Sequence, residues 1–298
     1  MLASSSCHRK LRLSPVVDNG SNTFMKFCFE LNEKSWEADL SKPLPIFIDL
    51  DFGGLQPNHF GVPQAKQTTF EGGGFVGDTS RGGGCNVDIL QMIPHCNGTH
   101  SETVGHIVDR AVDVARAGLQ SMFVAEVVSV QSQAASESKD TYRPELADDD
   151  HVISLAVLET SLDKKDFRGV EALVIRTLPN LERKKTLAYT EKDPFPFLSV
   201  QAIEKINELG VRHLLVDMPS IDRMHDDGLL TNHHLFWKVP EGTHELTKTT
   251  HVGKTITEMI FVPDSIADGR YLLNLQIPPF CSDAAPSRPI LFATKERQ

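Results

Sequence analysis

The sequence predicts a single α/β domain in which strands outnumber helices, and three observations predict this fold class. Short apolar segments with the composition of buried strands recur along the chain of 298 residues. One segment, 199–210, has the spacing and both end signals of an amphipathic helix. The chain is long enough for one large domain or two small ones, and no clear linker divides it. The pattern therefore favours an α/β or α+β class in one domain.

The predicted strands begin at 42–52, where the apolar residues Ile46, Ile48 and Leu50 alternate. β-Branched residues predict a further strand at 170–177. Apolar runs of similar length predict strands at 85–93, 122–131, 211–218, 254–262 and 270–278. Of these strands, 122–131 and 211–218 are predicted to be buried.

Two segments have helical spacing. Segment 107–118 is predicted to end at Gly118. In segment 199–210, Ser199 can cap the first turn and Gly210 ends the helix. The apolar face of this second helix consists of Ile203, Ile206 and Leu209.

Polar and glycine-rich segments interrupt this pattern. Gly72, Gly74 and Gly77 have the spacing of a dinucleotide-binding fingerprint, which requires a strand before it and a helix after it. No apolar strand precedes these glycines and no helical pattern follows them, so a flexible loop is predicted. Segment 132–150 is polar and charged and predicts a surface loop, whereas 151–158 fits a strand or a short helix.

Composition excludes several classes of protein. A net charge of −10 argues against binding to nucleic acid or to an anionic membrane surface. No apolar run reaches the roughly 18–20 residues that span a bilayer, and the first 20 residues lack the apolar segment of a secretory signal. The five cysteines are odd in number and scattered, which suits a reducing compartment. The prediction is a cytoplasmic protein.

The segment 95–106, "HCNGTHSETVGH", is the densest cluster of metal-ligand side chains, with three histidines, a cysteine and a glutamate. In an extended backbone Cys96, His100, Glu102 and His106 would all point to one face, because alternate side chains share a face. In a helix residues 100 and 102 would lie about 200° apart. Thiolate, imidazole and carboxylate are good ligands for first-row metals, so an extended segment predicts half of a metal site.

A second cluster lies far along the chain. Adjacent histidines stand at His233 and His234, and Glu258 lies in an otherwise apolar predicted strand. A carboxylate at an inward position of such a strand is costly unless it is paired or bound to metal. We therefore predict that the two clusters meet in space and complete one site.

Seven blocks of this sequence occur in the order typical of one family. The blocks are "DLSKPLPI", "CNGTHSETVGH", "GVEALVIRTLPN", "AIEKINELGVRHLLVDMPSID", "NHHLF", "ITEMI" and "QIPPFCSDAAPSRPILF". Through them the chain resembles the metal-dependent cyclase family, the group that includes bacterial kynurenine formamidase and isatin hydrolase. The resemblance extends over roughly residues 38 to 293.

The resemblance implies a fold and a domain organisation. The expected fold is an α/β, cyclase-like swivelling β/β/α single domain with a central mixed, partly barrel-like sheet and flanking helices. Residues 1–37 would form a variable N-terminal segment and 38–298 the hydrolase domain. Insertions are expected near 53–84, 131–150 and 238–250.

The resemblance also implies roles for individual residues. The metal ligands of the family fall on Cys96, His100, Glu102, His233 and Glu258. Its proton donor and acceptor falls on His106. Cys96 stands where the family has histidine, and Glu102 stands where it has aspartate. His95 and His234 are the alternative ligands beside Cys96 and His233.

The implied function is a metal-dependent hydrolase that cleaves a small amide, cyclic amide or ester by attack of metal-bound hydroxide on a carbonyl, with His106 as proton shuttle. The expected cofactor is a divalent metal, Zn²⁺ with Mn²⁺ as the alternative, with one or two ions per chain. A thiolate at Cys96 and the carboxylates of Glu102 and Glu258 would together balance two ions and one hydroxide.

The expected partners are a small-molecule substrate and further copies of the chain, in a homodimer or homotetramer. The altered ligands keep a second hypothesis open, in which the chain binds a small molecule or a metal without catalysis.

Overall fold

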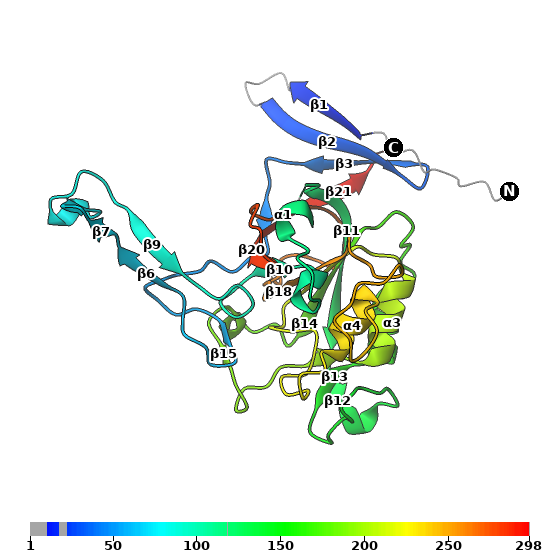
Figure 1. Cartoon of the computed structure of the whole chain (residues 1–298). Helices are drawn as coiled ribbons and strands as arrows, with labels where there is room; N and C mark the ends of the chain where they lie inside the picture. Colours follow the sequence, from blue (N-terminus) through cyan, green and yellow to red (C-terminus); the bar gives the residue numbers. More distant parts are fainter. Residues whose placement is uncertain (1–10, 18–22, 118, 298) are drawn as a thin grey trace.

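A computed structural model describes residues 11–17, 23–117 and 119–297, and within them a 12-stranded mixed sheet forms the centre of the molecule (Figure 1). The strand order is β1-β2-β3-β21-β19-β11-β14-β17-β18-β10-β20, and β4 pairs with β21. The strands are β1 (Leu11–Val17), β2 (Thr23–Leu31), β3 (Lys34–Asp39), β4 (Leu44–Pro45), β10 (His100–Glu102), β11 (Met122–Gln131), β14 (Ala172–Leu178), β17 (His213–Val216), β18 (Thr255–Glu258), β19 (Gly269–Gln276), β20 (Ala284–Pro286) and β21 (Arg288–Glu296). The predicted α/β class with a mixed sheet is confirmed.

Three helices cover one face of this sheet: α2 (Leu155–Leu162), α3 (Val200–Glu208) and α4 (Thr231–Trp237). The helix predicted over 199–210 is confirmed as α3. Ser199 caps it by accepting a hydrogen bond from the Ala202 amide at 3.1 Å, and Gly210 follows it with a φ of 74°. Helix α4 is the element that carries the predicted histidine pair.

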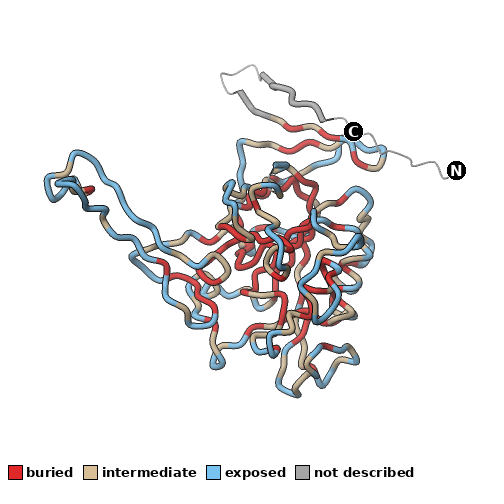
Figure 2. Tube along the Cα trace, viewed as in Figure 1, coloured by how far each residue is buried: buried red, intermediate tan, exposed pale blue. Residues whose placement is uncertain are grey.

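The four parallel strands β11, β14, β17 and β18 are buried on both faces (Figure 2). In β14, Leu173 and Ile175 pack with Ile203 of α3 on the helical side. Val174, between them, packs with Val127 of β11 on the opposite side. Continuous apolar strands are expected where a parallel sheet is covered on both faces. Full burial of each such side chain stabilises the fold by about 1.5–3 kcal/mol.

Two predicted elements are much shorter than expected. The segment 42–52 forms only β4, because its backbone groups bond to several different segments. The Ile46 amide donates to Pro289 O at 3.2 Å, whereas the Ile48 amide donates to Thr99 Oγ1 at 2.8 Å. No single partner strand therefore builds a ladder along it.

The helix predicted at 107–118 is likewise reduced to α1 (Val114–Ala117), and Gly118 lies outside the described residues. In a longer α-helix, the amides of Val114 and Ala115 would donate hydrogen bonds within the helix. Here Val114 N donates to Ser282 O at 2.8 Å, and Ala115 N donates to Phe280 O at 3.2 Å.

The glycine-rich segment forms part of an arm that projects from the body of the molecule (Figure 1). Its strands are β6 (Lys66–Thr69), β7 (Glu71–Gly72), β8 (Phe75–Val76) and β9 (Asp88–Gln91). β6 pairs with β9 and β7 pairs with β8, and most residues of the arm are exposed (Figure 2). The dinucleotide fingerprint is absent as a structure, since these glycines lie in a hairpin and not between a strand and an α-helix.

The N-terminal segment adds strands to the central sheet. Within its described part, β1 pairs with β2, β2 with β3, and β3 with β21. Strand β3 crosses the predicted division between residues 37 and 38, so the two parts share one strand. The division itself, and the insertions near 53–84, 131–150 and 238–250, stay predictions. Among the described residues there is no helix with the length and apolar character that a bilayer crossing requires.

Candidate metal centre

The antiparallel pairing of β10 with β18 brings the two predicted clusters together. His100 is directly opposite Glu258 in this pairing, and directly opposed residues project to the same face. The His100 Nε2 atom lies 3.4 Å from Glu258 Oε2, and both side chains are buried. Residues about 160 positions apart in sequence therefore lie next to each other in the structure.

The imidazole of His100 is oriented by the chain just before it. Its Nδ1 contacts the Gly98 carbonyl at 3.0 Å, so Nδ1 carries the proton and Nε2 presents its lone pair to the site. Gly98 has a φ of 99°, a backbone conformation that favours glycine. The Nε2 atom of His100 is buried and makes no hydrogen bond within the described residues.

Glu102 lies at the centre of the site. Its Oε1 is 2.9 Å from His233 Nε2, and its Oε2 is 2.9 Å from His95 Nδ1. Burial would raise the pKa of Glu102, but the imidazoles of His106 and His233 hold that pKa well below its usual range. The carboxylate is therefore ionised although it is fully buried.

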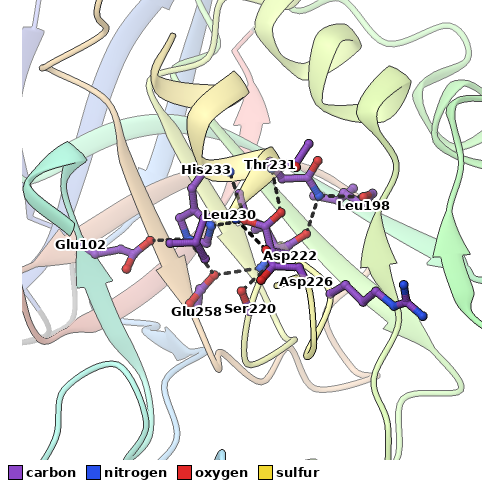
Figure 3. A network of polar contacts seen from close by, with 12 residues as sticks. Glu102, Leu198, Ser220, Asp222, Asp226, Leu230, Thr231, His233 and Glu258 are labelled. Carbon is purple, nitrogen blue, oxygen red and sulfur yellow. Dashed lines mark hydrogen bonds and ion pairs between the residues drawn. The ribbon is translucent and has the colours of Figure 1, made fainter. Parts of the chain in front are cut away.

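A second carboxylate positions His233 from behind (Figure 3). Asp222 contacts the Nδ1 atom of His233, and it also accepts hydrogen bonds from the amides of Asn232 at 2.7 Å and His233 at 3.2 Å. Asp222 thus binds the first turn of α4 and fixes the imidazole, which directs Nε2 toward Glu102. Burial would lower the pKa of His233, but Glu102 and Asp222 raise it well above its usual value. A carboxylate behind a histidine is the usual support of a metal ligand.

The opening of the site is formed by His95, His106 and Asp283. His106 ends the short 3₁₀ turn η2 (Val104–His106), and its ring stacks on that of His95 with centroids 4.1 Å apart. Asp283 Oδ2 lies 2.8 Å from His95 Nε2 and 3.5 Å from His106 Nδ1. These three side chains are 25–35% exposed, in contrast to the buried interior of the site.

The protonation of His95 follows from its partners. Burial would lower the pKa of this imidazole, but its contacts with Asp283 and Glu102 raise the pKa to about 10. The same contacts hold the pKa of Asp283 well below its usual range, chiefly through hydrogen bonds with His106 and His95. Without a cation, imidazolium groups therefore compensate the buried carboxylates.

Two groups of three side chains have the geometry to hold a metal ion. They are His95, Glu102 and His106, and His100, Glu102 and Glu258, with all ligand atoms of a group within 4.8 Å of one another. Glu102 belongs to both. Nitrogen and carboxylate oxygen donors suit Zn²⁺ and related divalent ions. The buried Nε2 of His100 has no hydrogen-bond partner among the described residues, which a metal ion would provide. The residues present fit a divalent cation.

Two predicted ligands remain outside these groups. Cys96 is buried close to Glu258, and burial followed by the charge of Glu258 raises the pKa of its thiol to about 11. His95, the alternative beside it, contacts Glu102 instead. His233 contacts Glu102 directly, whereas His234 faces away and its Nδ1 lies 3.3 Å from the Val239 carbonyl.

Sequence reasoning did not identify three polar residues at or beside this site: Asp222, Asp283 and His59. Asp222 and Asp283 lie in two of the sequence blocks that resemble the family, "VDMPSID" and "CSDAAPSR". Their place in these blocks is the sequence feature that could have identified them. His59 is a single histidine in a glycine-rich region, and no spacing distinguishes it.

Comparison with known proteins agrees with this fold. The family model described as "Putative cyclase" matches residues 17–223. Kynurenine formamidase of Bacillus thuringiensis (strain Al Hakam) is 28% identical over 145 residues, which are 47% of this chain and 60% of that protein. Kynurenine formamidase of Bacillus cytotoxicus is 30% identical over 131 residues, which are 44% of this chain and 53% of that protein. The chain thus matches little more than half the length of these relatives.

Solved structures show the same architecture over most of the chain. Isatin hydrolase A from Labrenzia aggregata, bound to benzyl benzoate, has a TM-score of 0.54 at 16% identity, over 85% of this chain and 94% of that one. Isatin hydrolase A from Ralstonia solanacearum has a TM-score of 0.54 at 14% identity, over 85% of this chain and 92% of that one. The family model matches more than half of the residues of this chain. This chain therefore belongs to the cyclase family.

Proposed function

We propose that this protein is a metal-dependent hydrolase that cleaves a carbon–nitrogen bond in a small, non-peptide amide. The observation that carries the proposal is the pair of ligand groups that share Glu102, one buried and one open to solvent. The kynurenine formamidase relatives and the isatin hydrolase neighbours support the class of reaction. Cyclic amides and esters are included, since their carbonyl carbon reacts in the same way.

The buried group would hold the ion through His100, Glu102 and Glu258, and Glu102 would itself be held by His233. A bound divalent cation supplies a Lewis acid and lowers the pKa of a coordinated water to about 7. We propose Zn²⁺ as this ion, with Mn²⁺ as the alternative, because nitrogen and oxygen donors accommodate both.

His106 is the group that we propose moves the proton. Its Nδ1 faces Asp283, which leaves Nε2 as the atom that can exchange a proton with solvent and substrate. As the carbon–nitrogen bond breaks, Nε2 would pass to the leaving nitrogen the proton that it takes from the attacking water. Asp283 and the stacked ring of His95 would hold His106 in place during both transfers.

The ligand groups favour a single buried ion. Cys96 belongs to neither group, so its thiol is not counted among the charges that face the ion. The carboxylates of Glu102 and Glu258 then supply two negative charges, which one divalent cation balances. This differs from the balance for two ions, which needs a thiolate at Cys96.

A pair of variants compares the two adjacent candidates His95 and Cys96. H95A is expected to weaken metal binding by about 10–100-fold, because His95 directly contacts the shared carboxylate of Glu102. C96S is expected to keep both metal content and activity within about twofold, since a neutral buried thiol resembles a hydroxyl in size. Metal titration of both variants measures the difference. The reverse order of affinities would assign the ligand role to Cys96.

The proposed function is tested by elemental analysis of the purified protein together with a panel of formamides, cyclic amides and lactones. We expect about one divalent ion per chain, hydrolysis of at least one amide, loss of activity after chelation and recovery after metal is restored. A protein that carries metal but hydrolyses no member of the panel would contradict the proposal and favour the binding function. The homodimer or homotetramer and the cytoplasmic location stay predictions.

A further inference from the structure

We infer that His59 is a substrate-binding residue whose imidazole forms hydrogen bonds with a polar group beside the scissile amide. This inference rests on the proposed function and adds a specificity-determining side chain to it. His59 belongs to neither ligand group. Three observations carry the inference: its place beside the metal centre, its unpartnered ring nitrogens, and its position against a large cavity.

The backbone holds His59 against the segment that carries the metal ligands. The His59 amide donates a hydrogen bond to the Cys96 carbonyl at 3.1 Å. On its other side, β5 (Asn58–His59) pairs in parallel with β15 (Ala188–Tyr189), and His59 lies opposite Tyr189. The ring is fixed by Phe60, with centroids 3.7 Å apart, and by the edge of Phe195 at 5.3 Å. The imidazole therefore has a defined position.

Neither nitrogen of the His59 ring is hydrogen-bonded within the part of the chain that the structure describes. His59 is 3% exposed, and neither Nδ1 nor Nε2 makes a hydrogen bond with any described residue. Buried polar atoms in native proteins are nearly always hydrogen-bonded, and an unsatisfied one costs about 1–3 kcal/mol. A ligand with a donor and an acceptor could supply the hydrogen bonds of both nitrogens.

The protonation state of His59 suits this role. Burial, and next the imidazoles of His100 and His225, lower its pKa to about 3. The ring is therefore neutral throughout the physiological range and offers one N–H donor and one nitrogen acceptor. A neutral amide presents the complementary pair, a carbonyl acceptor and an N–H donor.

His59 lies against residues that line a cavity of about 530 Å³: its ring contacts Phe195, and it pairs opposite Tyr189. The cavity contains none of the residues of either ligand group. His100, which belongs to the buried ligand group, is near enough to lower the pKa of His59. A substrate that is bound at the metal and extends toward this cavity would pass the imidazole of His59.

The test compares three variants of the full-length, metal-loaded protein on the amide that it hydrolyses fastest. H59F keeps a planar ring but removes both hydrogen bonds, whereas H59Q keeps one donor and one acceptor. H213F is the matched control. His213 is also a buried histidine, with its pKa lowered to about 3, and it packs on Phe123 in β17.

We expect H59F to raise KM about tenfold with little change in kcat, because the lost hydrogen bonds act on bound substrate and transition state alike. H59Q should recover most of the loss. Metal content should equal that of the unmodified protein in both variants, and H213F should leave KM unchanged.

Three outcomes would overturn the inference. Unchanged KM in H59F would show that the imidazole does not touch the substrate. Loss of metal in H59F would make His59 a metal ligand. An equal rise of KM in H59F and H213F would indicate a general structural effect. If the unmodified protein hydrolyses no amide, the inference fails together with the proposed function, and that result is distinct from all three.

Discussion

Replacing His100 with alanine is expected to remove the bound metal and to lower kcat/KM for an amide substrate by about 10³-fold or more. His100 is fully buried, its Nε2 has no hydrogen-bond partner among the described residues, and Glu258 Oε2 lies 3.4 Å away. Without the imidazole, the buried ligand group retains only its two carboxylates. Elemental analysis and steady-state kinetics measure the two effects.

H100A leaves a cavity beside a buried carboxylate and could therefore lose metal because the protein unfolds. A second variant, H100N, distinguishes this effect from loss of the ligand atom. H100N can still donate to the Gly98 carbonyl but lacks the atom that faces Glu258, so it should lose metal as H100A does. His251, which contacts the Phe236 carbonyl outside the site, provides the control, and H251A should keep metal and activity. Full activity in either His100 variant would contradict the proposed site.

The second large effect is expected at His106, where H106N should lower kcat by about 10²–10³-fold while metal content is retained. His106 lies at the open edge of the site with a side chain 27% exposed, and the buried ligand group does not include it. Its loss therefore removes the proton transfer and not the cation. Single-turnover kinetics and elemental analysis on the same preparation separate these two consequences.

The result for His106 decides between its two structural roles. His106 also belongs to the open ligand group with His95 and Glu102. If H106N loses metal in proportion to activity, His106 is a ligand and the proton shuttle must be another side chain. Retention of metal with a reduced kcat supports the proposed role.

Regular elements with one strong periodicity were predicted well from sequence. The strand at 122–131 coincides with β11, and the helix at 199–210 contains α3. In both elements, the apolar residues whose spacing predicts the local conformation are also the residues that become buried. Local and tertiary preferences therefore agree. The segments 42–52 and 107–118 behave differently, because their backbone donors bond to distant parts of the chain.

Local chemistry was sufficient to predict that the segments around residue 100 and around residues 233–258 hold metal-ligand side chains. The kinds of side chain can be read without a fold. The predicted alternation holds only for His100 and Glu102, because β10 ends at Glu102, Cys96 lies in a turn and His106 lies in the 3₁₀ turn η2. The pairing of His100 with Glu258 depends on the antiparallel register of β10 with β18, which alternation along one strand does not determine.

The choice among neighbouring side chains depended on tertiary structure alone. His95 and not Cys96 contacts Glu102, and His233 and not His234 does so, because the path of the backbone decides which of two adjacent residues faces inward. Asp222 orients His233 across 11 residues, and Asp283 reaches His95 across 188. Such contacts arise only when the packed sheet brings separate loops to one edge, since no local spacing encodes them.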